Sequence, residues 1–270
     1  MPTTVKIVLI TGANTGIGYQ IIRALNVSTS AYTILLGSRS LRKAEAAIQS
    51  LATEFPSTKS TVVPVQIDIE DDASIAAAFE SIKTEYGRLD ALVNNAGAQF
   101  DQQLTAGKMT MREVWDASWR VNTASTHVMT HTFAPLLLKS SDPRLLFVTS
   151  GTSTLQDSDN RELAVNKIPG PGWPKQGLAA GAGIPAYRSS KTGMNMMMRE
   201  WHRILSADGV KVWCISPGFL ATNLGGNQDA NKQFGAQDPA LGGTFIRSVL
   251  EGERDDDVGK VVSRAGVQPW

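Results

Sequence analysis

The sequence contains almost no cysteine and no long apolar run. Of its 270 residues only Cys214 is a cysteine, so no disulfide can form within the chain. Cys214 lies in the apolar run 212–215, where we expect it to be a small buried hydrophobic residue. No apolar run has the length of a membrane span, and a strand and a glycine loop follow the N-terminus too closely to leave room for a signal peptide. We therefore expect a soluble, cytoplasmic protein of a reducing compartment.

An excess of charge of one sign is also missing. Lysine and arginine total 26 residues, aspartate and glutamate total 25, and the formal net charge is +1. A nearly neutral chain argues against nucleic acid or an anionic membrane as the main partner. The acidic run 253–257 is expected to be a solvated loop. A chain of this length that is 42% hydrophobic can form one large core or two small domains.

A glycine-rich loop follows the first apolar run. Residues 5–10 form a short run rich in β-branched residues and predict a buried strand, and the residues after the loop, through Leu25, predict a helix. Missing Cβ atoms let a backbone approach a pyrophosphate, and a helix N-terminus adds free N–H groups. The spacing G-x-x-x-G-x-G differs from the better-known G-x-G-x-x-G, and a plain turn is the alternative. The candidate cofactor-binding residues in this loop are Gly12, Asn14, Thr15, Gly16, Ile17 and Gly18.

An arginine follows the second expected strand, which spans residues 32–37. Ser40 is positioned to cap a helix that extends to about Glu54. In folds of this kind an acid after the second strand binds the ribose hydroxyls of NAD, whereas an arginine accepts the 2′-phosphate of NADP. Arg39 stands there and no acid does, so the sequence predicts NADP(H). A solvated arginine is the alternative.

Strands and helices alternate through the rest of the chain. Further strands are expected at 61–67, 89–93, 144–149, 210–215 and 260–263, and further helices from Asp71 or Asp72, over 109–139 as two helices that meet near Asn122, and over 239–250. This alternation predicts an α/β fold with a doubly wound parallel sheet of Rossmann type. We expect about seven strands, helices on both faces and a single domain over residues 1–270.

Polar and small residues stand where these strands end. Ligands bind at the carboxyl ends of the strands in open α/β sheets. The residues after the fourth strand also fit a simple turn. The strand-end candidates are Asp68, Ile69, Asn95, Ala96, Gly97, Ser150, Pro217 and Gly218.

Tyr187 and Lys191 are four residues apart, so on a helix their side chains would lie on one face. A phenol with a pKa of about 10 is a poor proton donor or acceptor at neutral pH. A neighbouring ammonium favours the phenolate and lowers that pKa. The pair is therefore a candidate for proton transfer, although the same spacing also occurs by chance on surface helices.

A long segment separates Ser150 from Tyr187. Residues 156–185 are rich in glycine, proline and charge, and the segment is too long for a routine loop. It leaves the carboxyl end of the fifth strand, so we expect an insertion next to the substrate site, with Trp173 and Leu178 as lid residues. A surface insertion without function is the alternative.

Two histidines, His127 and His131, are four residues apart, a spacing that suits a metal. No third ligand is evident in the sequence. We therefore expect packing or surface roles for both and no metal site.

These motifs together resemble the short-chain dehydrogenase/reductase family, and the resemblance spans nearly the whole chain. The matching parts are the loop 11–18, Asn94-Asn95-Ala96-Gly97, Asn122, Ser150, Tyr187 with Lys191, and Pro217-Gly218 with Thr222. The segment between the serine and the tyrosine is longer than in many members and looks like that of monomeric carbonyl reductases. Monomer and homo-oligomer both remain open.

The resemblance implies NADPH-dependent reduction of a ketone or aldehyde to an alcohol, with the reverse oxidation possible. It implies that Ser150 stabilises the negative charge on the carbonyl oxygen and that Tyr187 donates the proton. Lys191 would hold the nicotinamide ribose and lower the tyrosine pKa. Asn122 would anchor a relay water, and Thr222 would hold the carboxamide.

Large apolar residues follow the fourth, fifth and sixth strands, and no obvious charge among them could hold a carboxylate or phosphate. They predict a bulky, mostly apolar small-molecule substrate, unless the side chains simply pack on the protein. The candidate substrate residues are Phe100, Leu155, Trp173, Phe219, Leu220 and Leu224. Two other functions stay open: an NADP-binding protein without catalysis, and a fold relative recruited to a non-redox biosynthetic step.

Overall fold

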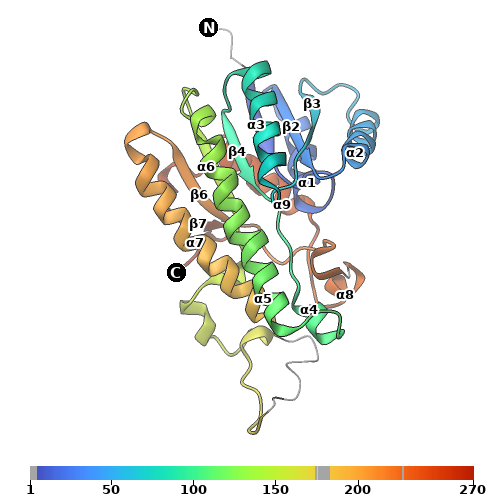
Figure 1. The fold of residues 1–270 in the computed structure, drawn as a ribbon, viewed down its shortest axis with the longest axis vertical. Coiled ribbons are helices and arrows are strands. Elements are labelled where there is room, and N and C mark those ends of the chain that lie inside the picture. The colour runs from blue at the N-terminus through green and yellow to red at the C-terminus, as the bar shows by residue number, and fades with distance from the viewer. Residues whose placement is uncertain (1–4, 174, 176–182, 227) are drawn as a thin grey trace.

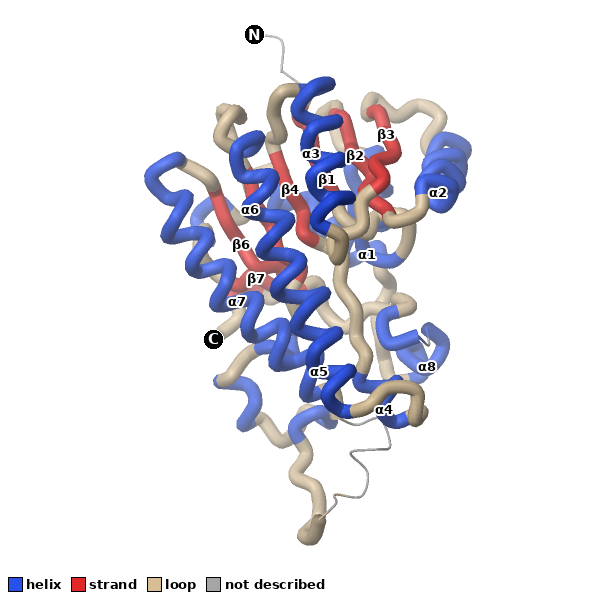
Figure 2. The backbone as a smooth tube through the Cα atoms, viewed as in Figure 1, coloured by secondary structure: helices blue, strands red, loops and turns tan. Residues whose placement is uncertain are grey.

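Eight strands form one sheet in the part of the chain that the computed structural model describes, which is residues 5–173, 175, 183–226 and 228–270. The order is β3-β2-β1-β4-β5-β6-β7-β8 (Figures 1 and 2). The strands are β1 (Lys6–Ile10), β2 (Tyr32–Ser38), β3 (Thr61–Gln66), β4 (Ala91–Asn94), β5 (Arg144–Val148), β6 (Lys211–Ser216), β7 (Val261–Ser263) and β8 (Gly266–Val267). All neighbours are parallel except β7 and β8. The doubly wound α/β fold is confirmed, and β8 is an antiparallel edge strand beyond the seven expected.

Helices cover both faces of the sheet (Figure 1). One face packs against α1 (Gly16–Asn26), α2 (Leu41–Glu54) and α9 (Ala240–Leu250), and the other against α3 (Asp72–Tyr86), α6 (Thr126–Leu137) and α7 (Pro185–Leu205). Successive side chains of β1 alternate between the two cores, with Leu9 in one and Ile10 in the other. A strand that is covered on both faces in this way has a continuous apolar sequence, as residues 7–10 do.

Two expected helix starts are confirmed by their caps. The Ser40 hydroxyl accepts a hydrogen bond from the Lys43 N–H at 3.4 Å at the start of α2. The Asp71 carboxylate accepts from the N–H groups of Ala73 and Ser74 at the start of α3. Such caps satisfy N–H groups that the first helical turn leaves without partners.

The expected helical stretch 109–139 is interrupted at Asn122. Helix α5 (Met111–Trp119) continues into a π-helical turn, η1 (Arg120–Ser125), and then into α6. Turns of this kind occur frequently at functional sites. Short helices were not expected, and they include α4 (Asp101–Thr105), α8 (Gln228–Gln233) and the 3-10 helices η2 (Gly151–Ser153), η3 (Gln156–Asp159), η4 (Ala164–Asn166), η6 (Ser206–Asp208), η7 (Leu224–Gly226) and η8 (Asp255–Asp257).

The burial of Cys214 is confirmed, because none of its surface is exposed in β6.

Within the described ranges, no helix combines the length and apolar character needed to cross a membrane. Leu178, one of the two expected lid residues, lies outside the described residues.

The acidic run 253–257 is not the solvated loop that we expected. Asp255 accepts hydrogen bonds from Arg144 at 2.6 and 3.0 Å and from Lys211 at 2.6 Å. Arg144 begins β5, is only 4% exposed and also contacts Asp142. The hydrogen bonds that Arg144 donates lower the pKa of Asp255. The run therefore neutralises a buried cation at the amino ends of the strands, because an isolated buried charge would be costly.

Replacing Asp255 with asparagine is expected to destabilise the fold. Arg144 would keep only Asp142 as a charged partner, and the free energy of unfolding near pH 6 should fall by roughly 1 to 2 kcal/mol. Because the folded-state pKa of Asp255 is lowered, its contribution is present above the unfolded pKa of about 4 and is lost as pH falls below it. Urea denaturation at several pH values measures the difference.

The control is Asp256→Asn, which removes the same charge from an exposed neighbour in the same run. This variant should stay within a few tenths of a kcal/mol of the wild type. Equal losses in both variants would contradict the role given to Asp255.

Candidate active site at the carboxyl edge of the sheet

The glycine loop after β1 lies directly against the loop after β4. A Cβ atom built on Gly12 would lie 3.1 Å from the Ala96 Cα, and one built on Gly18 would lie 2.7 Å from the Asn95 Nδ2. Contacts shorter than about 3 Å are not seen for real Cβ atoms. Gly12 and Gly16 also have φ of 62° and 58°, a region that residues with a Cβ avoid. The missing Cβ atoms thus let the backbone at the start of α1 lie close to the residues that follow β4.

Thr11 holds these two loops together, a role that the sequence did not single out. Its Oγ1 accepts hydrogen bonds from the N–H groups of Asn95 and Ala96 at 3.0 and 2.9 Å. The Asn95 Nδ2 donates to the Thr11 carbonyl at 2.8 Å and to the Gly12 carbonyl at 3.3 Å. Asn95 therefore braces the glycine loop, whatever further contact it makes with a ligand.

The ends of β2 and β3 lie on the other side of the same loop. The Ser38 hydroxyl donates to the Asn14 Oδ1 at 3.1 Å. The next residue, Arg39, is exposed and makes no hydrogen bond or ion pair with any described residue. After β3, the Asp68 carboxylate accepts from the Glu70 N–H at 3.1 Å, and Ile69 is buried. The exposed guanidinium is thus free to bind an anion beside the loop.

The loop after β6 approaches the start of α1 from the third side. A Cβ on Gly16 would lie 4.0 Å from that of Thr222. Gly218 has φ of 104°, which lets the chain turn after Pro217. The candidate cofactor residues from these separate strand ends therefore line one continuous stretch of the carboxyl edge. Whether they bind a cofactor stays a prediction.

Asn122 connects the loop after β4 to helix α7. Its Oδ1 accepts from the Ala98 N–H at 3.0 Å, and its Nδ2 donates to the Ala98 carbonyl at 2.9 Å and to the Ser190 hydroxyl at 3.0 Å. A Cβ on Gly97 would lie 2.9 Å from that Oδ1 and 3.3 Å from the Lys191 Nζ. The glycine thus allows the strand-end loop to lie against Asn122 and Lys191.

Tyr187 and Lys191 lie in α7 as expected, and both are buried. The Tyr187 side chain lies near Ser150, which follows β5 and whose Oγ accepts a hydrogen bond from the Thr152 N–H at 3.1 Å. The Lys191 ammonium donates to the Val148 carbonyl at 2.8 Å and lies 5.9 Å from the centre of the tyrosine ring. The structure therefore brings together Asn122, Ser150, Tyr187 and Lys191, from the π-helical turn, the end of β5 and α7.

The pKa of Tyr187 differs from our expectation. Burial raises it to about 12, and the hydrogen bond with Ser150 opposes this rise without reversing it. Burial also lowers the pKa of Lys191, to about 8. Removing both groups from water disfavours the charged form of each, and this outweighs the expected attraction between ammonium and phenolate.

Helix α7 has two further partners that sequence reasoning missed. The Asp101 carboxylate accepts hydrogen bonds from the N–H groups of Ala186 and Tyr187. The Arg188 guanidinium donates to the carbonyls of Thr152 and Val165 at 2.9 and 3.3 Å. The base of the insertion is therefore tied to the helix that carries Tyr187. These partners are more than twenty positions from α7 in the sequence, so no local pattern reveals them.

The six candidate substrate residues do not share one environment. Leu220 is buried against α9 near Gly242, and Phe100 packs on the core beneath α4. Trp173 is 84% exposed, so it does not reach into the site as we expected. Leu155 is 67% exposed, and Phe219 and Leu224 are also exposed. Leu220 and Phe100 pack on the protein here, and the substrate roles of all six stay predictions.

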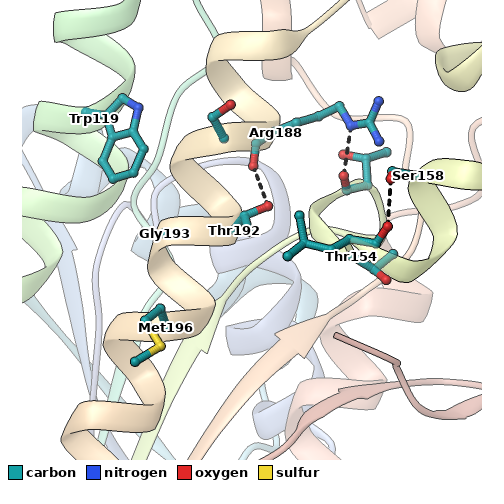
Figure 3. A pocket seen from close by; sticks show the side chains of 10 residues that line it. Trp119, Thr154, Ser158, Arg188, Thr192, Gly193 and Met196 are labelled. Carbon is teal, nitrogen blue, oxygen red and sulfur yellow. Dashed lines mark hydrogen bonds between the residues drawn. The ribbon is translucent and has the colours of Figure 1, made fainter.

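Leu155 faces a groove on the outer side of α7. Trp119, Met196 and Thr192 line the same groove, and Tyr187 does not. Figure 3 shows Arg188 extending from α7 toward the segment that carries Thr154 and Ser158. In this structure Leu155 therefore lines a different space from Tyr187.

The two histidines lie on the outer side of α6. The His127 ring lies 5.2 Å from that of Trp201, and His131 is exposed. Among the residues that the structure describes, no three His, Cys, Asp or Glu side chains are arranged to hold a metal ion.

The chain matches the model of the short chain dehydrogenase family over residues 6–160 and 175–233. The residues left between these two ranges belong to the insertion. A short-chain dehydrogenase/reductase of Phoma sp, eupG, is 44% identical over 98% of this chain and 97% of its own length. Another from Talaromyces stipitatus, tropE, is 42% identical over 98% of both chains.

Solved structures share the fold at lower identity. The NADPH-bound carbonyl reductase from chicken fatty liver superposes with a TM-score of 0.76, at 23% identity, over 98% of this chain and 99% of that one. The L-sorbose reductase of Gluconobacter frateurii, in complex with NADPH and L-sorbose, gives a TM-score of 0.72 at 19% identity, over 96% of this chain and 95% of that one.

Replacing Gly97 with alanine is expected to destabilise the protein, because the new methyl group would press on the Asn122 Oδ1 and the Lys191 Nζ. Overpacking of this kind typically costs about 1 to 3 kcal/mol. Gly170→Ala is the matched control, since a Cβ there meets nothing within 4 Å. Chemical denaturation of both variants measures the effect. A Gly97 variant as stable as the Gly170 variant would show that the close approach is not required.

Proposed function

Because this chain belongs to the short-chain dehydrogenase/reductase family of oxidoreductases, we propose that it is an NADPH-dependent carbonyl reductase. It reduces a bulky, mostly apolar ketone or aldehyde to an alcohol, and runs in reverse with excess NADP. The observation that carries the proposal is the meeting of Asn122, Ser150, Tyr187 and Lys191 at the carboxyl edge of the sheet. The single cysteine is compatible with a cytoplasmic location. We propose that the protein acts as a monomer or a homo-oligomer.

The residues at this edge fit NADPH. The backbone of Gly12, Gly16 and Gly18, which carries no Cβ atoms, and the N-terminus of α1 suit a pyrophosphate. Arg39 offers an unpartnered guanidinium for the 2′-phosphate. The remaining contacts are proposed for Asn14, Thr15, Ile17, Asp68, Ile69, Asn95, Ala96, Gly97, Tyr187, Lys191, Pro217, Gly218 and Thr222. When bound, NADPH supplies the hydride that the carbonyl carbon receives.

Two side chains of the protein interact with the oxygen of that carbonyl. The Ser150 hydroxyl donates a hydrogen bond to the oxygen as negative charge develops. Tyr187 donates its proton to the same oxygen, and its raised pKa means that it carries that proton at neutral pH. The reverse oxidation needs the phenolate, which the raised pKa makes scarce at neutral pH. Lys191 is proposed to hold the cofactor ribose, and Asn122 to anchor a water that relays the replacement proton to Lys191.

The substrate is proposed to bind between the segments after β4 and β6. The side chains of Gln99 and Gln102 contact Gly225, so these two segments meet over the site. Leu224 directly precedes Gly225, and both Phe219 and Leu224 are exposed and offer apolar surface. Burying such surface favours a large neutral ketone, at roughly 25 cal/mol per Å² removed from water. The insertion 156–185, tied to α7 by Arg188, is proposed to bound the same space.

Replacing Tyr187 with phenylalanine tests the assigned chemistry. The variant keeps the ring and loses the proton, so kcat for ketone reduction should fall about 10²- to 10⁴-fold. NADPH affinity, measured by fluorescence, should change little. A variant within a few fold of the wild type would remove Tyr187 from the mechanism. NADPH binding with no turnover of any ketone by the wild type would favour the non-catalytic alternative.

Replacing Arg39 with aspartate tests the cofactor. Losing a charged hydrogen bond and adding a repulsive carboxylate should weaken NADPH binding by about 10- to 100-fold or more. NADH binding should hold or improve, because a carboxylate can accept from ribose hydroxyls. Arg112→Asp, at an exposed arginine of α5, is the control for the charge change. Equal NADH and NADPH affinities in the wild type would contradict the role of Arg39.

A further inference from the structure

We propose that Asp101 is a positioning residue for catalysis: its buried carboxylate holds the first turn of α7, and with it Tyr187, in the place from which the proton is delivered. The inference rests on the proposed function and goes beyond it. Asp101 begins the short helix α4 and touches no reacting group itself. It acts through the backbone of Tyr187.

The contacts are direct and involve both carboxylate oxygens. Oδ1 accepts from the Ala186 N–H at 3.0 Å, and Oδ2 accepts from the Tyr187 N–H at 3.1 Å. Asp101 is only 6% exposed. The N–H groups of a first helical turn have no partner within the helix, so a buried helix start needs acceptors from elsewhere. For two of these groups in α7, Asp101 is that acceptor.

Among the described residues that precede it, helix α7 has no local alternative to this cap. Its own N-cap residue, Ile184, has no side-chain hydrogen bond, and Pro185, which follows, has no N–H. The helices α2, α3 and α5 are instead capped by the residue just before each of them, Ser40, Asp71 and Thr110. Only in α7, among these, does the acceptor come from a distant segment.

That distant segment is the one that follows β4. Two ties therefore join it to α7: Asn122 links Ala98 to Ser190, and Asp101 links α4 to the residue that carries the phenol. Ser150, which lies near the Tyr187 side chain, follows β5 instead. The distance between the two hydroxyl groups thus depends on where the first turn of α7 is held.

The charge of Asp101 is balanced by this helix start. No ion pair to Asp101 is present among the described residues, and the positive end of the α7 dipole lies at its carboxylate. Burial raises the pKa of Asp101, while the N–H groups of Ala186 and Tyr187 oppose that rise. An asparagine would keep the shape but could accept through only one oxygen, and an alanine through none.

The experiment compares Asp101→Asn and Asp101→Ala with Asp71→Asn and Asp71→Ala. Asp71 is the matched control, because its carboxylate also accepts from two N–H groups of a helix start, in α3. Aryl ketones such as acetophenone serve as the substrate panel. The readouts are kcat, the KM for NADPH, and the primary isotope effect on kcat with NADPH deuterated at the transferred C4 position. Hydrogen exchange at the amides of residues 186 and 187 reports on the helix start without any turnover.

We expect kcat to fall roughly 10- to 100-fold in the Asp101 variants, with alanine worse than asparagine. The KM for NADPH should stay within a few fold, and the isotope effect should rise because chemistry becomes slower relative to other steps. Asp71 variants should leave the isotope effect unchanged. A loss of folded protein alone lowers kcat without moving the isotope effect, so this readout separates positioning from stability.

An unchanged isotope effect in folded Asp101→Ala would overturn the proposal, as would equal changes in the Asp71 variants. Unchanged exchange at residues 186 and 187 would overturn it as well. Faster exchange there supports the cap even if the wild type reduces no ketone. That last result would reject the proposed function while leaving the hold on α7 intact.

Discussion

Close approach of backbone segments at the carboxyl edge is the constraint on which the site depends. Gly18 lets the start of α1 lie against Asn95, and Gly97 lets the loop after β4 lie against Asn122 and Lys191. A methyl group at either position would separate these segments. Parallel strands bring their carboxyl ends to one edge, but only residues without a Cβ let the loops there pack into a single unit.

Burial of that unit sets the electrostatics of the site. It raises the pKa of Tyr187 and lowers that of Lys191, because water is excluded from both charged forms. The same exclusion would strengthen every hydrogen bond aimed at a developing oxyanion. Arg144 and its acidic partners lie at the opposite, amino ends of β5 and β6. One edge of the sheet thus neutralises a buried charge, and the other brings the four candidate catalytic residues together.

Much of the fold could be predicted from the sequence, because its signals are local. Alternating strands and helices gave the doubly wound sheet, and Ser40 and Asp71 marked helix starts that the structure has. The site is different, since Thr11 meets Asn95 across 84 positions and Asp101 meets Ala186 across 85. Nor does a sequence say which way an apolar side chain turns: Leu220 packs inward and Trp173 outward. The pKa of Tyr187 was mispredicted because burial is a property of the folded chain.

The most direct measurement of the central claim follows one hydrogen atom. The wild-type protein is incubated with a bulky aryl ketone and NADPH that carries deuterium at the transferred C4 position, and the product is analysed by mass spectrometry and NMR. Hydride transfer at this site predicts an alcohol with one deuterium on the carbinol carbon, formed in step with NADPH oxidation. A product formed without deuterium, or formed equally well without NADPH, would contradict the account.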